Sequence, residues 1–177
     1  MGCFPLAPFS GRIAQGRFTA AGRVVELGRN HPLDPGHPHA LHGFDWLSAF
    51  EVVAATPSRT ELRCRRDKGP WPWCYETVQV FTLMKDGFRL DLSLENLSSS
   101  PMPAGLGIHP YFPRPAARLT LHVDGRWETS ADLIPTRFRQ LSSAPDWFGG
   151  PAIDHCYAGR RGSIEIDWPS HRLSVEP

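Results

Sequence analysis

Apolar and polar residues alternate with a period of two along three segments of the chain. FRLDLSLEN (88–96) places an apolar residue at every second position from Phe88 to Leu94. RLTLHVD (118–124) and SIEIDW (163–168) repeat this pattern. Because successive side chains of a β-strand point to opposite faces, each segment is predicted to form a half-buried strand with a polar outer face.

Four further segments are weaker strand candidates, centred on Val24, Val52, Leu62 and Val78. The Asp86-Gly87 pair before segment 88–96 predicts a tight hairpin, and no window has the spacing of an amphipathic helix. The 18 prolines and 16 glycines supply the turns that short strands need. The sequence therefore predicts an all-β fold, a large antiparallel β-sandwich, formed by a single domain over 1–177.

The charge balance limits the classes of partner. The chain has 19 Lys and Arg residues against 18 Asp and Glu residues, whereas a nucleic-acid-binding protein usually carries a basic excess. No apolar run approaches the roughly 20 residues of a membrane span, and the N-terminus lacks the features of a signal peptide. The four cysteines show no CxxC spacing. We therefore expect a cytoplasmic protein with reduced thiols and with no nucleic-acid or membrane partner.

The stretch PMPAGLGIHPYFP (101–113) holds one histidine, His109, at the end of a predicted strand. Pro110 favours an extended conformation at His109, and the following Tyr111 and Phe112 can flank its ring. Histidine exchanges protons near neutral pH and sugars stack on aromatic faces, so this setting suits a general acid that acts on a sugar. A structural histidine, with both ring nitrogens bonded to the backbone, would give the same local sequence.

Three histidines crowd the segment HPHALHG (37–43). The spacing of His37, His39 and His42 could place imidazoles on a metal, as in a cupin-like β-barrel. Prolines flank the first two and no carboxylate obviously completes a site, so the sequence favours no metal centre. His42 is the strongest candidate of the three, because Gly43 follows it where a strand is expected to begin.

Two more segments carry side chains suited to sugar hydroxyls. In PFSGRIAQGRF (8–18), Arg12 lies among turn residues and apolar anchors, where its planar guanidinium can donate to hydroxyls. In AIDHCYAG (152–159), Asp154 can accept from two neighbouring hydroxyls, although aspartate is also common as a turn cap. Neither segment is specific on its own.

Taken together, these segments resemble the aldose 1-epimerase (galactose mutarotase) family over nearly the whole chain. The matching motifs are PFS-x-RIA-x-GRF, LHG at 41–43, ENLSSSPMPAGLGIHPYF at 95–112 and IDHCY at 153–157. The resemblance implies a galactose mutarotase-like supersandwich that interconverts the α and β anomers of free aldohexoses. It also implies a small-molecule sugar as partner and no metal or organic cofactor.

Mutarotation needs an acid that protonates the ring oxygen and a base that takes the proton of the anomeric hydroxyl. By resemblance, His109 is that acid. His42 and Arg12 would hydrogen-bond the sugar and its developing charge, and Asp154 would hold its hydroxyls. Groups matched to individual hydroxyls also give specificity, since an unpaired buried partner is costly.

The chain departs from the family pattern in three ways. The family base is a glutamate on a late strand, whereas Glu176 follows Asp154 too soon, so we expect the base to be absent from this chain. Gly11 stands where the family usually has asparagine before the arginine. Strands of the family fold are missing at both ends, so we expect the central part of the fold and an incomplete sandwich whose open edges invite association.

Several function hypotheses stay open beside aldose 1-epimerase-like activity. A non-catalytic carbohydrate-binding relative would keep the sugar-binding groups without the base. A hexose-6-phosphate epimerase would use basic residues such as Arg65, Arg66 and Lys68, and a metal-binding β-barrel would use the three histidines of segment 37–43. Glycoside hydrolysis fits poorly because it needs two opposed carboxylates. The sequence specifies neither the preferred aldose nor the oligomeric state.

Overall fold

The computed structural model describes residues 2–149 and 153–176. Within them the chain forms sixteen β-strands and two three-residue 3-10 helices, η1 (Ala14–Gly16) and η2 (Asp45–Leu47). The predicted all-β class is confirmed, and no helix among these residues is long and apolar enough to cross a membrane. The chain divides into two compact units, Met1–Tyr111 and Phe112–Pro177, and the assignment of 1–177 to a single domain stays a prediction.

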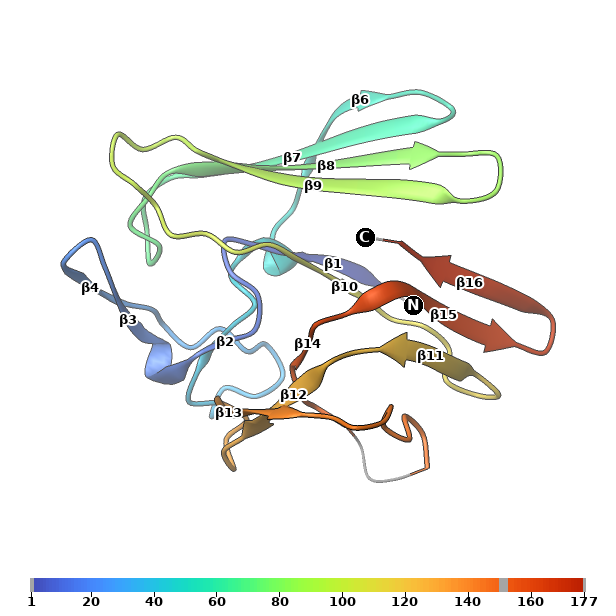
Figure 1. Ribbon diagram of the computed structural model, residues 1–177. Coiled ribbons are helices and arrows are strands. Elements are labelled where there is room, and N and C mark those ends of the chain that lie inside the picture. Colours follow the sequence, from blue (N-terminus) through green and yellow to red (C-terminus); the bar gives the residue numbers. More distant parts are fainter. Residues whose placement is uncertain (1, 150–152, 177) are drawn as a thin grey trace. The chain divides into compact units, whose positions relative to one another are not determined.

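The first unit contains the strands β1 (Cys3–Leu6), β2 (Arg12–Ile13), β3 (Arg17–Ala20), β4 (Arg23–Glu26), β5 (Ala40–Leu41), β6 (Glu51–Ala55), β7 (Arg59–Arg66), β8 (Tyr75–Leu83), β9 (Phe88–Asn96) and β10 (Gly107–Pro110). Strands β6 to β9 form a four-stranded antiparallel meander in chain order (Figure 1). The shorter strands make three antiparallel pairs, β1 with β10, β2 with β5 and β3 with β4.

The β8–β9 hairpin confirms the prediction made from the Asp86-Gly87 pair. The N–H of Met84 donates to the carbonyl oxygen of Gly87 at 2.8 Å, which closes the turn. Strand β9 coincides with the predicted segment 88–96. Its apolar positions are only partly buried, however, and Phe88, the first residue of the strand after the turn, is 65% exposed.

The core of the first unit is a cluster of buried apolar side chains, formed by Phe9, Val25, Leu27, Ala40, Trp71, Trp73 and Tyr75. The two tryptophans come from the segment between β7 and β8 and pack with ring centroids 5.4 Å apart. Trp71 also stacks on Phe18 of β3 at 5.3 Å. Aromatic packing of this kind attaches the small strand pairs to the same core as the end of the meander.

The second unit contains the strands β11 (Arg118–His122), β12 (Gly125–Thr129), β13 (Pro135–Gln140), β14 (Tyr157–Ala158), β15 (Arg161–Trp168) and β16 (His171–Val175). They form two three-stranded antiparallel sheets, β11-β15-β16 and β13-β12-β14 (Figure 1). Strands β11 and β15 confirm the predictions for segments 118–124 and 163–168. Among the described residues of this unit, only Gly125 and Ile166 are buried, so its apolar core is thin.

Candidate functional site

The structure places three of the predicted site residues in the first unit. Arg12 begins β2, His42 follows β5, and His109 lies in β10. Asp154 and Glu176 belong to the second unit, so their participation in a common site stays a prediction. The geometry of the first three residues is therefore the basis of the candidate site.

His42 lies on a turn and not at the start of a strand, so the expectation of a strand from Gly43 onward is wrong. Both residues have a left-handed backbone, with φ of 57° at His42 and 71° at Gly43. The cause is the carbonyl oxygen of Ala7, which accepts the N–H groups of Phe44 at 2.8 Å and Asp45 at 3.2 Å. A Cβ atom at position 43 would lie 2.0 Å from that oxygen, so only glycine fits at this position.

The backbone of Gly11 determines how the His42 ring is held. The Gly11 N–H donates to Nδ1 of His42 at 3.1 Å, and the His42 N–H donates to the carbonyl oxygen of Gly11 at 2.8 Å. A ring nitrogen that accepts a hydrogen bond carries no proton, so the neutral ring has its proton on Nε2. His42 is thus arranged as a hydrogen-bond donor through Nε2.

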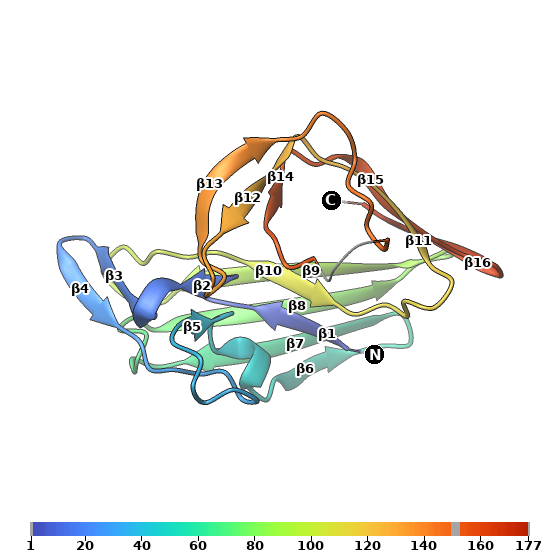
Figure 2. The same ribbon diagram turned by 90° about the horizontal axis from the view of Figure 1, so that it is seen from below.

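His109 is held between strand pairing and aromatic contacts. In the β1–β10 pair, visible side by side in Figure 2, His109 lies opposite Phe4. Its ring stacks on Tyr111 with centroids 4.8 Å apart and an interplanar angle of 22°, which confirms the predicted contact with that tyrosine. The His42 ring lies 5.3 Å from the His109 ring at an angle of 79°. The two imidazoles, 67 residues apart in the sequence, therefore form one cluster.

Arg12 enters the same region through the β2–β5 pair. It lies opposite Leu41, the residue before His42. Burial lowers the pKa of His37, and the neighbouring His31, His39 and Arg12 lower it further. The β2–β5 pairing therefore places Arg12 beside the residue that precedes His42.

The histidines of segment 37–43 do not support the metal-site hypothesis. Nδ1 of His39 accepts the N–H of Gln15 at 3.0 Å, just as Nδ1 of His42 accepts a backbone N–H. The rings of His37 and His39 pack edge to face at 5.4 Å. Within the described ranges 2–149 and 153–176, no group of three or more His, Cys, Asp and Glu residues is arranged to hold a metal ion. These imidazoles serve as packing and hydrogen-bonding groups in the loop.

A buried polar network, which the sequence reasoning missed, anchors the segment after His42. Asp45 has no exposed side-chain surface, and its Oδ1 accepts the hydroxyl of Tyr75 at 2.8 Å and lies 3.4 Å from Nε of Arg66. Burial raises the pKa of Asp45, although hydrogen bonds from Thr77, Tyr75 and Arg66 oppose the shift. Arg66 also donates to the carbonyl oxygen of Phe44 at 3.1 Å. Asp45 lies three positions after His42, but its partners are distant in sequence, so no local signal reveals them.

The sequence model of the family described as Aldose 1-epimerase matches residues 1–176. The chain belongs to the aldose 1-epimerase family. The protein YphB of Escherichia coli strain K12 is 30% identical over 181 residues, which cover 98% of this chain and 60% of YphB. This aldose 1-epimerase family member therefore spans less than two thirds of the length of that relative.

Two solved structures place the family member among known folds. A protein from E. coli K12 named as a candidate aldose 1-epimerase has a TM-score of 0.81 and 29% identity, over 95% of this chain and 58% of that chain. The GalM/aldose epimerase homologue from Caenorhabditis elegans has a TM-score of 0.78 and 16% identity, over 96% of this chain and 60% of that chain. The second likeness concerns the fold alone. Together they confirm the galactose mutarotase-like fold class.

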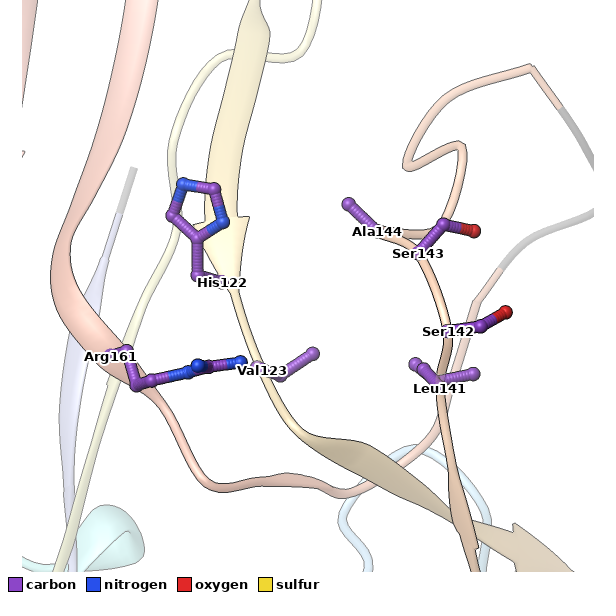
Figure 3. Close-up of a pocket in the computed structure, with 7 residues that line it drawn as sticks. All are labelled: His122, Val123, Leu141, Ser142, Ser143, Ala144 and Arg161. Carbon is purple, nitrogen blue, oxygen red and sulfur yellow. The ribbon is translucent and has the colours of Figure 1, made fainter.

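The second unit of this family member contains a cavity of about 200 Å³, which Figure 3 shows. His122 and Arg161 lie on one side of it, and Ala144 points toward them from the other. The hydroxyls of Ser142 and Ser143 point away from both basic side chains (Figure 3). The cavity lining includes none of the residues predicted for sugar chemistry. The candidate site of the family member is thus the His42–His109 cluster with Arg12.

Proposed function

We propose that the chain binds the ring of a free aldohexose at Arg12, His42 and His109 and interconverts its α and β anomers. The observation that carries this proposal is the imidazole pair, with centroids 5.3 Å apart and one ring held as an Nε2–H donor by a backbone contact. Membership of the aldose 1-epimerase family supports the reaction class. Tyr111, stacked on His109, offers the kind of aromatic surface on which sugars pack.

The proposed reaction opens and closes the pyranose ring. His109 gives its proton to the ring oxygen while a base, for which Glu176 is the candidate in this chain, takes the proton of the anomeric hydroxyl, and the bond between the anomeric carbon and the ring oxygen breaks. The aldehyde that forms rotates about its bond to the neighbouring carbon. The ring then closes on the opposite face as both protons return, so the atoms balance without any co-reactant.

His42 and Arg12 act on the oxygen atoms during this cycle. The Nε2–H of His42 donates to an oxygen that gains negative charge, and the Arg12 guanidinium adds a fixed positive charge nearby. Such preorganised donors lower the barrier because they need no rearrangement at the moment of reaction. Asp154 would hold the sugar hydroxyls, as the resemblance to the family implies.

Sugar binding without turnover is the second candidate function. The observation that favours it is the exposure of Glu176, the carboxylate of this chain that could correspond to the glutamate base of the family. Glu176 is exposed, and its Oε1 accepts the hydroxyl of Ser174 at 3.0 Å. If Glu176 does not serve as the base, His109 lacks its partner for proton transfer.

The hexose-6-phosphate hypothesis is weakened by the position of Arg66. This guanidinium already contacts Asp45, Phe44 and Ser48 within the protein. A phosphate subsite in this loop would have to use Arg65 and Lys68 alone.

Exchange NMR on the purified protein with glucose or galactose tests the proposed function. Saturation transfer between the two anomeric protons measures turnover, and dispersed methyl signals confirm that the protein is folded. We expect His109→Ala to reduce the exchange rate on the order of 100-fold or more, because it removes the general acid. His122→Ala is the matched control, since His122 is an exposed histidine of β11 in the second unit.

The outcomes separate the two candidates. Exchange that disappears in His109→Ala and persists in His122→Ala supports the mutarotase. A folded protein that binds sugar without exchange supports the second candidate. A folded protein that neither binds sugar nor exchanges its anomers contradicts both.

A further inference from the structure

The side chain of Asn30 reaches across the loop to the two residues that flank His42. Its Nδ2 donates to the carbonyl oxygen of Leu41 at 2.8 Å and to that of Gly43 at 2.6 Å. Its Oδ1 accepts the N–H of Leu41 at 2.7 Å. One half-buried carboxamide therefore makes three short hydrogen bonds to the backbone on both sides of His42.

The backbone at His42 needs such support. A φ of 57° is unfavourable for a residue with a side chain, and it persists only where the surroundings hold it. If the turn relaxed toward an ordinary conformation, the ring would leave the Gly11 N–H that bonds its Nδ1. The orientation of the His42 ring and the position of its proton are thus linked to the same turn.

We infer that Asn30 is a positioning residue that fixes the His42 turn and, through it, the Nε2–H donor of the candidate site. It acts through His42 and not on the sugar itself. This inference rests on the proposed function, because His42 is a sugar-binding group only there. It assigns to the loop that begins at Asn30 the task of orienting the imidazole.

The chemistry of the carboxamide explains why asparagine fits this position. Two carbonyl oxygens need N–H donors and one N–H needs an acceptor, and only a carboxamide offers both within one short side chain. Aspartate would set a carboxylate against the oxygens of Leu41 and Gly43, which it cannot bond when ionised. Alanine would leave the N–H and the carbonyl oxygen of Leu41 without the carboxamide, and the carbonyl oxygen of Gly43 would keep only the Nε1–H of Trp46, at 3.2 Å.

The decisive measurement is the ¹⁵N chemical shift of both ring nitrogens of His42, recorded on labelled full-length protein without sugar. In the wild type we expect an unprotonated Nδ1 and a protonated Nε2. In Asn30→Ala we expect a mixture of the two tautomers, together with an anomer-exchange rate reduced on the order of 100-fold, since small misplacements of a reacting group cost about that much. The tautomer signature would not change if Asn30 contributed only to overall stability.

Asn96→Ala is the matched control. The Asn96 carboxamide also bonds the backbone through both its nitrogen and its oxygen, donating to the carbonyl oxygen of Ser100 at 2.9 Å and accepting the N–H of Ser98 at 2.9 Å, but it is exposed. This variant should leave the His42 shifts unchanged. If Asn30→Ala does not fold, Asn30→Ser, which keeps one donor and one acceptor, takes its place. We expect the same mixture of the two His42 tautomers in that variant.

The ring shifts and the sugar assay can fail independently. A wild type without sugar binding or exchange contradicts the proposed function, while the ring shifts still test the role of Asn30. A folded Asn30→Ala or Asn30→Ser protein that keeps the wild-type ring shifts overturns the inference, whatever happens to the sugar assay. A wild type whose His42 carries its proton on Nδ1 overturns it as well.

Discussion

At the residue scale, the backbone of Gly11 holds the His42 ring in place. Its carbonyl oxygen accepts the N–H of His42, and its own N–H donates to Nδ1 of the His42 ring. Its φ of 82° is left-handed, a region that asparagine enters more readily than most other residues. The family's preference for asparagine at this position is therefore compatible with the same backbone.

Gly11→Asn should strengthen sugar binding in this chain. No atom lies within 4 Å of a Cβ built at position 11, so the new side chain fits, and its amide adds a hydrogen-bond donor and acceptor beside Arg12. One added hydrogen bond predicts an affinity gain of roughly three- to tenfold. Titration with galactose, followed by NMR, measures it.

Gly22→Asn provides the control for Gly11→Asn. Gly22 also has a left-handed φ, 73°, and open space around it, but it lies on the β3–β4 turn. Unchanged affinity in both variants would show that position 11 does not face the sugar.

Asp45 predicts a pH dependence of stability that can be isolated by substitution. Because burial raises its pKa in the folded protein, its contribution is fully present below the unfolded-state pKa of about 3.9 and is lost as the pH rises through the folded-state pKa. Asparagine at this position cannot ionise. The free energy of unfolding of the wild type, minus that of Asp45→Asn, should therefore fall from acidic to neutral pH.

Urea unfolding at several pH values between about 3.5 and 7.5 measures this difference. Asp86→Asn is the control, because Asp86 is an exposed aspartate in the β8–β9 turn. A wild-type-minus-Asp45→Asn difference that rises with pH would mean that the bonds from Tyr75 and Arg66 outweigh the burial of the charge.

At the scale of elements, the chain after β1 meets the turn after β5 at Ala7 and Gly43. Gly43→Ala would push a Cβ to 2.0 Å from the carbonyl oxygen of Ala7 and would strain a φ of 71°. We expect a loss of unfolding free energy on the order of 3 kcal/mol, measured by urea unfolding. Gly22→Ala has a similar φ and no close neighbour, so it should show the smaller cost of φ alone.

Elements with long periodic segments could be predicted from the sequence, and the two-residue strands β2 and β5 could not. Strands β9, β11 and β15 have five or more residues, and their alternation is visible locally. Strands β2 and β5 have two residues each, too few for any period, and exist because they pair with each other. The strand expected from Gly43 onward was wrong for a related reason. The carbonyl oxygen that bonds the turn there belongs to Ala7, which is distant in sequence.

The candidate site shows the same division. His42, His109 and Arg12 could be proposed from motifs, because each belongs to a recognisable stretch. Asn30 could not, since an asparagine beside His31-Pro32 has the composition of an ordinary turn and nothing local indicates that its amide reaches residues 41 and 43. A side chain that orients another residue often belongs to a distant part of the chain, and a local sequence pattern does not reveal such a contact.

At the scale of the whole molecule, the two units differ in how much they bury. Strand β8 of the first unit holds Tyr75 and Thr77 with no exposed surface and Gln79 at 6%. The second unit buries only Gly125 and Ile166 among its described residues. The free energy of local opening follows buried contacts, so the units should open with different ease.

Hydrogen exchange followed by mass spectrometry tests this difference. We compare β8 with β12, because each is an inner strand of its sheet with neighbours on both sides. Amides of β8 should exchange at least roughly tenfold more slowly than those of β12. Equal protection would show that backbone hydrogen bonding, and not apolar burial, dominates the stability of both units.

The contact between position 43 and Ala7 also bears on how the Leu-His-Gly motif should be read across a set of related sequences. Glycine is required there by packing alone, whether or not a sugar is ever bound. A lineage that abandons the chemistry can replace the histidine and still has to keep the glycine to fold. Selection on the histidine and selection on the glycine therefore have different causes. A search for active enzymes should give weight to the histidine at position 42 and almost none to the glycine at position 43.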